Sequence, residues 1–525
     1  MAALSWEKTS RHFAGNLHCW PGPSIIILAT LATGFLLAFL PLTWAVSIVG
    51  ITAVLVLAVI QPLFALGLAL ITGPFGALES FWLGGASFDS GQLLLLLALA
   101  AWIGRRLIDR QFKHPRILLL VPLLLFISIG LLSLFSAPDK ILGLTEVIKW
   151  IEITTVMLMV ADLGSELGYK QLKNRRLSLA YGISWIVIMV MAAAVVQALI
   201  GIWQFMFRGE GPEHFVVLGR FYRAFGTFEQ PNPFGGYMNL TALLAIGILI
   251  GLLMALIHRI KNSASRNASP ENSSYLCVII AVLAVFFVAT MTTIALVFSW
   301  SRGAWMGFMA GLTIMAVFWP KRLRDGLLLF FVAIIGLVLL HQSNLLPPTI
   351  IDRVSGFTDD LTFDDVRGVD INDDNYSVLE RLAHWQAALD MAGDRPWFGI
   401  GIGNYGPAYT EYALLNWPDA LGHAHNYYLN ALAEVGVIGL MAYMLLWGMV
   451  FWQTLRILGR ESWPVRGVAL GLMGVWTALT FHHMVDKLYV NNIYIHLGVL
   501  MGLLQLVDFH TRQGMKNSGW TEINS

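Results

Sequence analysis

Three arginines occupy short segments between long apolar runs. Arg220 and Arg223 lie just before Ala-Phe-Gly-Thr-Phe-Glu-Gln-Pro-Asn-Pro, which leads into an apolar run, and Arg302 lies in Ser-Trp-Ser-Arg-Gly between two such runs. A guanidinium presents a fixed fork of N–H donors that fits phosphate oxygens. The three arginines therefore indicate a site for an anionic group such as a phosphate or diphosphate.

Two histidines stand close together before another apolar run. His423, His425 and Asn426 belong to Gly-His-Ala-His-Asn-Tyr-Tyr-Leu-Asn. Imidazole accepts a hydroxyl proton near neutral pH without a large change of its pKa, so the pair indicates a general base. The alternative is that the histidines are polar residues of a membrane interface.

An aspartate-rich stretch, Asp359 to Asn375, is the only segment that hints at a metal site. Its Asp-Ile-Asn-Asp-Asp-Asn core resembles a calcium loop, but Asn375 replaces the glycine at the sixth position and Arg381 replaces the glutamate at the twelfth. The two cysteines, Cys19 and Cys277, have no metal-ligand or disulfide-framework spacing. We therefore expect a solvated loop, no metal site and no cofactor.

Composition defines the elements that must position these residues. Of 525 residues, 57% are hydrophobic and 12% are charged, and the charged share is about half that of an average soluble domain. The apolar residues come in runs long enough to cross a bilayer as α-helices. The sequence thus predicts an all-α polytopic membrane protein of about 12 to 14 transmembrane helices. The net charge of +1 gives no indication of nucleic acid as a partner.

The predicted spans are separated by short loops, several of which are basic. The apolar segments are 24–40, 42–60, 62–78, 91–104, 117–135, 144–163, 178–206, 234–257, 276–298, 303–319, 326–341, 428–455, 466–483 and 491–509. The basic segments are 105–116, 170–176, 258–266, 321–324, 456–466 and 512–516. The positive-inside rule makes the basic segments cytoplasmic, so that both termini are inside and residues 208–233, 299–303 and 342–427 are outside.

This orientation bears on the arginines, because positive charge is scarce on the outer side of most membrane proteins. The simpler interpretation of these arginines is that each guanidinium reaches the lipid headgroups while the aliphatic part of the side chain stays in the apolar layer. The alternative is binding of a lipid phosphate or diphosphate. His482 and Asp486, near the outer end of another helix, would either line the same outer cavity or pair with each other.

We treat residues 1–525 as a single membrane domain with an extracytoplasmic loop at 342–427. In that loop, helical spacing of apolar residues predicts a helix over 377–392, with Ser377 and Glu380 as its capping pair. Pro396 to Tyr405 follows as a glycine-rich turn that would expose backbone amides.

Four blocks of residues 180–455 resemble the O-antigen ligase and O-antigen polymerase superfamily of bacterial envelope enzymes. The blocks are Arg223 to Pro233, Ser301 to Trp305, Glu380 to Tyr405, and His425 to Leu440. They occur in order and are spaced by membrane helices. The aspartate-rich insertion departs from the family pattern and leaves the acceptor open.

The resemblance implies a GT-C-like membrane glycosyltransferase that inverts the anomeric carbon without a metal ion. Such enzymes transfer a glycan from an undecaprenyl diphosphate carrier to an acceptor hydroxyl at the outer face of the bacterial inner membrane. By this resemblance Arg223 and Arg302 hold the diphosphate, and His425 deprotonates a glycan, lipid or protein acceptor. The candidate substrate-binding residues are Arg220, Arg381, His423, Asn426 and Glu434. Arg220 has no matching family position, and a structural role would also explain Glu434.

A secondary transporter or channel is the alternative from another class. Transporters place polar groups and broken helices near the bilayer midplane. Here the midplane segments are nearly apolar, and the candidate residues collect at one face beside a long loop. The sequence therefore favours the transferase.

Overall fold

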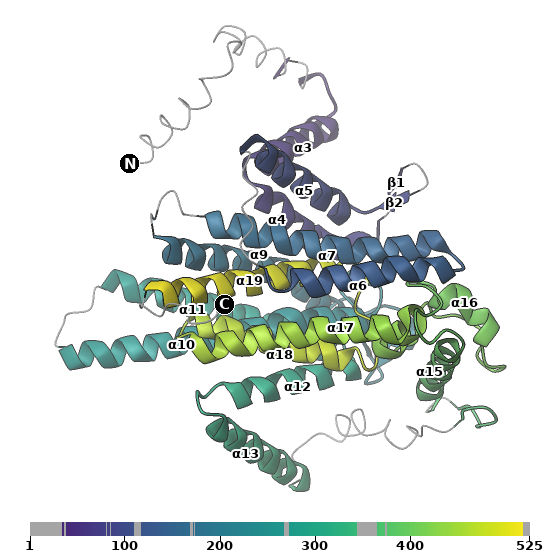
Figure 1. Cartoon of the computed structure of the whole chain (residues 1–525). Coiled ribbons are helices and arrows are strands. Elements are labelled where there is room, and N and C mark those ends of the chain that lie inside the picture. Colours follow the sequence, from purple (N-terminus) through teal and green to yellow (C-terminus); the bar gives the residue numbers. More distant parts are fainter. Residues whose placement is uncertain are drawn as a thin grey trace. The chain divides into compact units, whose positions relative to one another are not determined.

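The computed structural model describes residues 34–35, 38–79, 81–83, 86–109, 117–167, 172, 174–266, 272–343, 365–372 and 375–517. Over these residues the chain is almost entirely α-helical (Figure 1). It divides between Gln61 and Pro62 into two compact units. Helix α3 (Leu42–Ile60) belongs to the first unit, and every element named below belongs to the second.

The second unit is built from long helices joined by short connections. The helices are α4 (Pro62–Thr72), α5 (Ser90–Asp109), α6 (Leu120–Ser133), α7 (Lys140–Glu166), α9 (Arg175–Met206), α10 (Pro231–Arg266), α11 (Asn272–Phe298), α12 (Arg302–Phe318), α13 (Leu323–Gln342), α15 (Tyr376–Asp394), α16 (Tyr405–Tyr412), α17 (Tyr427–Arg460), α18 (Val465–His482) and α19 (Ile493–Asn517). Two small antiparallel hairpins pair β1 (Phe81–Leu83) with β2 (Ala86–Phe88), and β3 (Val216–Val217) with β4 (Phe221–Tyr222).

The predicted all-α polytopic membrane fold is confirmed. Among the described residues, eight helices are long and apolar enough to cross a membrane, and three further apolar helices are shorter. Each apolar segment predicted from residue 42 onward coincides with a helix, whereas the segment 24–40 lies largely outside the described residues. The eight long spans account for eight of the fourteen predicted segments. Helices α4, α6 and α12 are short, α7 carries the charges of Glu146, Lys149 and Glu152, and α18 is not among the eight. The segment 24–40 is the remaining one.

Glycines let α10 and α18 pack closely. A Cβ built on Gly247 of α10 would lie 2.3 Å from the backbone nitrogen of Gly471 on α18, so no larger residue fits there. Close approach of small residues is how helices associate in a bilayer, where burial of apolar surface gives little driving force. Nearer the site described below, Gly236 at the start of α10 lies against His482 at the end of α18.

The basic segments gather at one end of this helix bundle. Arg106 at the end of α5 bonds to Glu166 at the end of α7 (2.9 Å). Arg176 at the start of α9 lies 3.3 Å from His510 near the end of α19. Arg466 at the start of α18 donates to the backbone oxygen of Phe318 at the end of α12 (2.9 Å). The candidate functional residues therefore lie at the opposite end of these helices.

The glycine-rich turn after α15 packs onto a kink of α17. Gly436 has φ 66° and ψ −172°, outside helical values, and a Cβ there would lie 2.4 Å from the Trp397 carbonyl. The kink frees its neighbours' amides, and Val437 N donates to Pro396 O (2.8 Å). In return, Gly401 N donates to the backbone oxygen of Glu434 (2.9 Å). The hydrogen-bonding groups of the glycine-rich turn are therefore used to hold the turn against α17.

Helix α15 agrees with the predicted segment 377–392, but its predicted capping pair is wrong. The helix begins at Tyr376 with Asn375 as N-cap, so Ser377 lies inside the first turn. The Ser377 hydroxyl instead accepts a hydrogen bond from Arg302. Part of the aspartate-rich segment is anchored, because Val366 is buried against the apolar face of α15. Residues 359–364 and 373–374 lie outside the described residues.

Candidate functional site

A cavity of about 360 Å³ lies at the end of the bundle opposite the basic segments. Its lining includes Arg223, Asn232, Arg302, Arg381, His482 and Asp486. Arg223 follows β4, Arg302 starts α12, and Arg381 lies on α15. The structure thus brings three of the four arginines singled out from the sequence to one cavity.

Hydrogen bonds orient the guanidinium of Arg223. Its Nε donates to Ser299 O (3.0 Å), and its Nη2 donates to Asn232 Oδ1 (3.2 Å). The same Asn232 oxygen accepts from the Ser301 hydroxyl (2.9 Å). Arg223 is therefore tied both to the first turn of α10 and to the turn that leads into α12.

Arg302 and Arg381 meet at one serine. Arg302 Nη2 donates to Ser377 Oγ (3.2 Å), and Arg381 Nη1 donates to Ser377 O (2.7 Å). Since Ser377 lies in the first turn of α15, this helix positions both guanidinium groups at the cavity. The bond from Arg302 to Ser377 connects the start of α12 to the start of α15.

Three helices also begin at the cavity. The first turns of α10, α12 and α15 contribute Asn232, Gly303 and Ser377 to its lining. A helix N-terminus carries a partial positive charge and backbone N–H groups without partners inside the helix. The three helix starts add to the field of the three arginines, so the cavity is suited to an anion with several oxygens.

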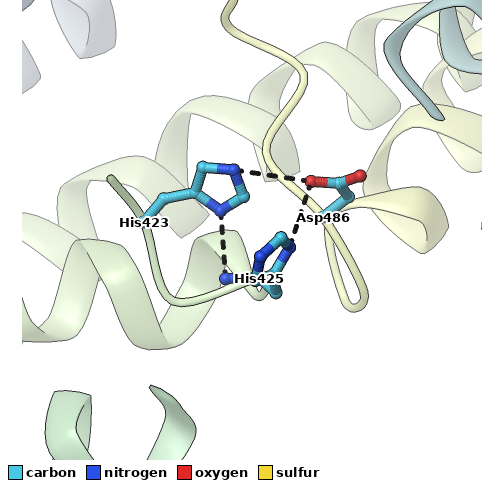
Figure 2. Close-up of side chains that lie close together, drawn as sticks. All are labelled: His423, His425 and Asp486. Atoms are coloured by element: carbon cyan, nitrogen blue, oxygen red, sulfur yellow. Dashed lines mark hydrogen bonds and ion pairs between the residues drawn. The ribbon is translucent and has the colours of Figure 1, made fainter. Parts of the chain in front are cut away.

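Beside the cavity, His423 and His425 converge on Asp486 (Figure 2). Asp486 Oδ1 lies 3.7 Å from His423 Nε2 and 3.7 Å from His425 Nδ1. The histidines belong to the loop before α17, and Asp486 belongs to the loop between α18 and α19. The backbone amide of Tyr427 joins these loops by donating to His483 O (2.8 Å).

The two histidines are not equivalent. His425 N donates to His423 Nδ1 (3.0 Å), so neutral His423 carries its proton on Nε2, facing Asp486. His425 has a positive φ of 49°, which is strained for a residue with a side chain. With Nδ1 of His425 directed at Asp486, its Nε2 is left to act on a substrate. This is the orientation that a carboxylate gives to a general base.

Charge in this cluster follows from burial and proximity. Burial lowers the pKa of His423 to about 3, although the Asp486 carboxylate opposes that change. Burial alone would raise the pKa of Asp486, but the adjacent histidines, His425 above all, hold it below its usual value. At neutral pH the cluster therefore contains an ionised Asp486 and a neutral His423.

The ligand atoms of His423, His425 and Asp486 lie within 4.8 Å of one another, close enough to hold a metal ion. The hydrogen bond at His423 Nδ1 argues against that use, because it leaves the proton on the nitrogen that would have to ligate the metal. To bind a metal at Nε2, His423 would have to lose either its hydrogen bond at Nδ1 or the remaining proton of its ring. The geometry favours a hydrogen-bonded cluster.

Besides His423 and His425, three predicted residues lie outside the cavity lining. Arg220 is exposed in the β3–β4 turn, 4.5 Å above the Phe221 ring. Asn426 caps α17 by accepting from the amides of Tyr428 (3.0 Å) and Leu429 (3.1 Å). Glu434 is buried under the glycine turn and accepts from Tyr405 N (3.1 Å). Their contacts in this structure are structural.

Other residues of the site had only weak signals in the sequence. The i, i+4 spacing of His482 and Asp486 indicated either a shared cavity or a mutual pair, and the structure places both in the cavity lining. Asn232 was part of a motif without an assigned role, and Ser377 was assigned to capping. Their contacts with arginines join distant segments, which sequence spacing does not reveal.

Comparison with known proteins identifies one family. Residues 286–444 match the family model described as O-antigen ligase. The matched segment includes Arg302, Arg381, His423 and His425, whereas Arg223 and Asp486 lie outside it. A search of curated proteins finds no match.

Proposed function

Because residues 286–444 match the O-antigen ligase family model, we propose that the chain belongs to the O-antigen ligase and polymerase superfamily and is an inverting glycosyltransferase. The chain is thus a multi-pass membrane enzyme of glycan assembly. We propose that its donor is a glycan on undecaprenyl diphosphate. The acceptor hydroxyl belongs to a glycan, a lipid or a protein.

One observation carries the proposal: the cavity with Arg223, Arg302 and Arg381 lies beside the His425–Asp486 pair. Cleavage of the donor leaves negative charge on the diphosphate, and preorganised donors stabilise that charge as it grows. One such donor is typically worth roughly 100- to 1000-fold in rate. The arginines can therefore perform the task for which other enzymes use a divalent metal.

His425 supplies the base in this reaction. The acceptor oxygen attacks the anomeric carbon opposite the diphosphate, and its proton moves to Nε2 of His425. The bond between the anomeric carbon and the phosphate oxygen breaks, and its electron pair leaves with the diphosphate. Asp486 stabilises the imidazolium that forms, as a carboxylate does in a Ser-His-Asp triad.

We place the reaction at the outer face of the bacterial inner membrane. The support is that the basic segments and the cavity lie at opposite ends of the helices, and basic segments favour the cytoplasm. The outer loop 342–427 then carries α15 and α16 over the cavity side.

The proposal is tested with purified protein in liposomes that contain an undecaprenyl-diphosphate-linked glycan and a candidate acceptor. We expect release of undecaprenyl diphosphate that depends on acceptor and on His425. A transporter would instead move solute across the membrane with the lipid-linked glycan unchanged, and this flux would survive His425→Ala. That result would overturn the proposed transferase.

A further inference from the structure

His482 is a histidine at the cavity with no role in the mechanism above. It is the last residue of α18, it is 1% exposed, and it lines the same cavity as the three arginines. Its backbone oxygen accepts from Asp486 N (3.0 Å), so the residue that contributes to the cavity also positions the partner of His425.

Among the buried histidines of the described residues, His482 differs in its hydrogen bonding. The others each bond through a ring nitrogen to a tyrosine or glutamate: His384 to Tyr405 (2.9 Å), His483 to Tyr443 (3.1 Å), His496 to Tyr237 (2.9 Å) and His510 to Glu461 (2.8 Å). Nδ1 of His482 is buried without a hydrogen-bond partner. No hydrogen bond from the other ring nitrogen, Nε2, is found among the described residues either. A histidine ring at the wall of a cavity with neither nitrogen bonded to the protein is available to bond to a ligand in that cavity.

The surroundings of the ring show which edge meets the cavity. A Cβ built on Gly236 of α10 would lie 3.3 Å from Nδ1 of His482. A Cβ built on Gly303, at the start of α12, would lie 3.2 Å from Nε2. Since Gly303 also lines the cavity, Nε2 is the nitrogen on the cavity side, next to the helix turn that begins with Arg302.

The proton of neutral His482 belongs on Nε2. One ring nitrogen carries the proton and the other a lone pair. Burying a lone pair without a partner costs less than burying an N–H without one, because orphaned N–H groups are the rarer case in folded proteins. The lone pair therefore lies on the buried Nδ1, and the donor faces the cavity.

We propose that Nε2–H of His482 donates a hydrogen bond to a phosphate oxygen of the lipid diphosphate, beside Arg302. This inference rests on the proposed function, since it names a further ligand of the same donor. His482 adds a donor without adding charge. Through its backbone bond to Asp486, it also links the diphosphate half of the site to the base.

The test measures binding of undecaprenyl diphosphate to purified protein in detergent. His482→Leu removes the donor, and we expect Kd to rise by roughly 10- to 100-fold, the usual range for a hydrogen bond to a charged group. His482→Gln places an amide N–H near the position of Nε2, so it should recover most of the affinity. His482→Asn, whose shorter amide reaches only the Nδ1 position, should not.

His483→Gln is the matched control. His483 is equally buried on the next residue, but its ring bonds to Tyr443 and does not line the cavity. We expect this variant to lose thermal stability and to keep its affinity. Should His482→Leu fail to fold, the Gln and Asn variants still separate the outcomes, because they differ in the reach of the donor.

Two results would count against the inference, and they are distinguishable. Equal affinity of wild type and the His482 variants, with weaker binding by Arg223→Lys and Arg302→Lys, would remove His482 from the diphosphate site and leave the proposed function intact. Equal affinity in all of these variants would overturn the diphosphate site itself.

Discussion

Nδ1 of His425 lies 3.7 Å from Oδ1 of Asp486, which belongs to a loop two membrane helices further along the chain. The distance is longer than a hydrogen bond, and a small movement on substrate binding would close it, as is common for catalytic pairs without substrate. The carboxylate is therefore positioned to orient the base when the acceptor binds.

We expect His425→Ala to leave the protein folded and able to bind the lipid-linked donor, because the arginines carry that binding. Turnover should fall by roughly 100- to 10,000-fold, the usual contribution of a positioned acid–base group. His423→Ala should have a milder effect, since His423 faces Asp486 and supports the His425 backbone. Donor affinity and turnover are measured for both variants in one preparation. Full activity of His425→Ala together with loss in His423→Ala would assign the base to His423.

Asp486→Asn should lower turnover by roughly 10- to 1000-fold with little change in donor affinity. The amide cannot stabilise the imidazolium of His425, and the long contact implies a smaller loss than in a tight triad. Asp365→Asn is the matched control, because Asp365 pairs with Arg367 in an exposed segment away from the cavity lining. An unchanged rate in Asp486→Asn would show that His425 acts without this carboxylate.

Arg223→Lys and Arg302→Lys keep the charge but lose the fork of donors, so each should reduce turnover by roughly 10- to 100-fold. Ser299, Asn232 and Ser377 hold these guanidinium groups in one orientation that an ammonium cannot reproduce. Arg367→Lys serves as the control. Wild-type turnover in both variants would contradict the prediction and would favour the alternative, in which the two arginines only contact lipid headgroups.

Activity should persist in excess chelator, since the arginines take the place of a metal at the diphosphate and the His423 tautomer disfavours ligation. The assay follows release of undecaprenyl diphosphate with and without chelator. Loss of activity that calcium, magnesium or zinc restores would contradict the prediction. It would also reassign His423, His425 and Asp486 as metal ligands.

The orientation is tested with introduced cysteines after both native cysteines are replaced. Leu415 is 94% exposed in the loop before α17, and Lys321 is exposed in the connection between α12 and α13. In intact spheroplasts, an impermeant thiol reagent should label Leu415→Cys, and should label Lys321→Cys only after permeabilisation. The reverse pattern would invert the topology.

The sequence alone determined the fold class, because long apolar runs leave an α-helix as the structure that satisfies every backbone group in a bilayer. It also determined the helix of the outer loop, whose apolar residues recur at helical spacing over 377–392. The arginines and histidines stood out because charged and titratable residues are rare beside such runs. These properties depend only on neighbouring residues in the chain, so the order of residue types in the sequence is enough to predict them.

Only the tertiary structure decided what those residues contact. Ser377 fits a capping pattern in the sequence, but α15 packs so that this hydroxyl meets Arg302. The glycine turn could have bound a ligand, but the kink at Gly436 uses its amides. Asp486 lies near His425 because the end of α18 is next to the start of α17. Contacts between distant segments depend on how helices pack, and residue spacing along one segment does not encode that packing.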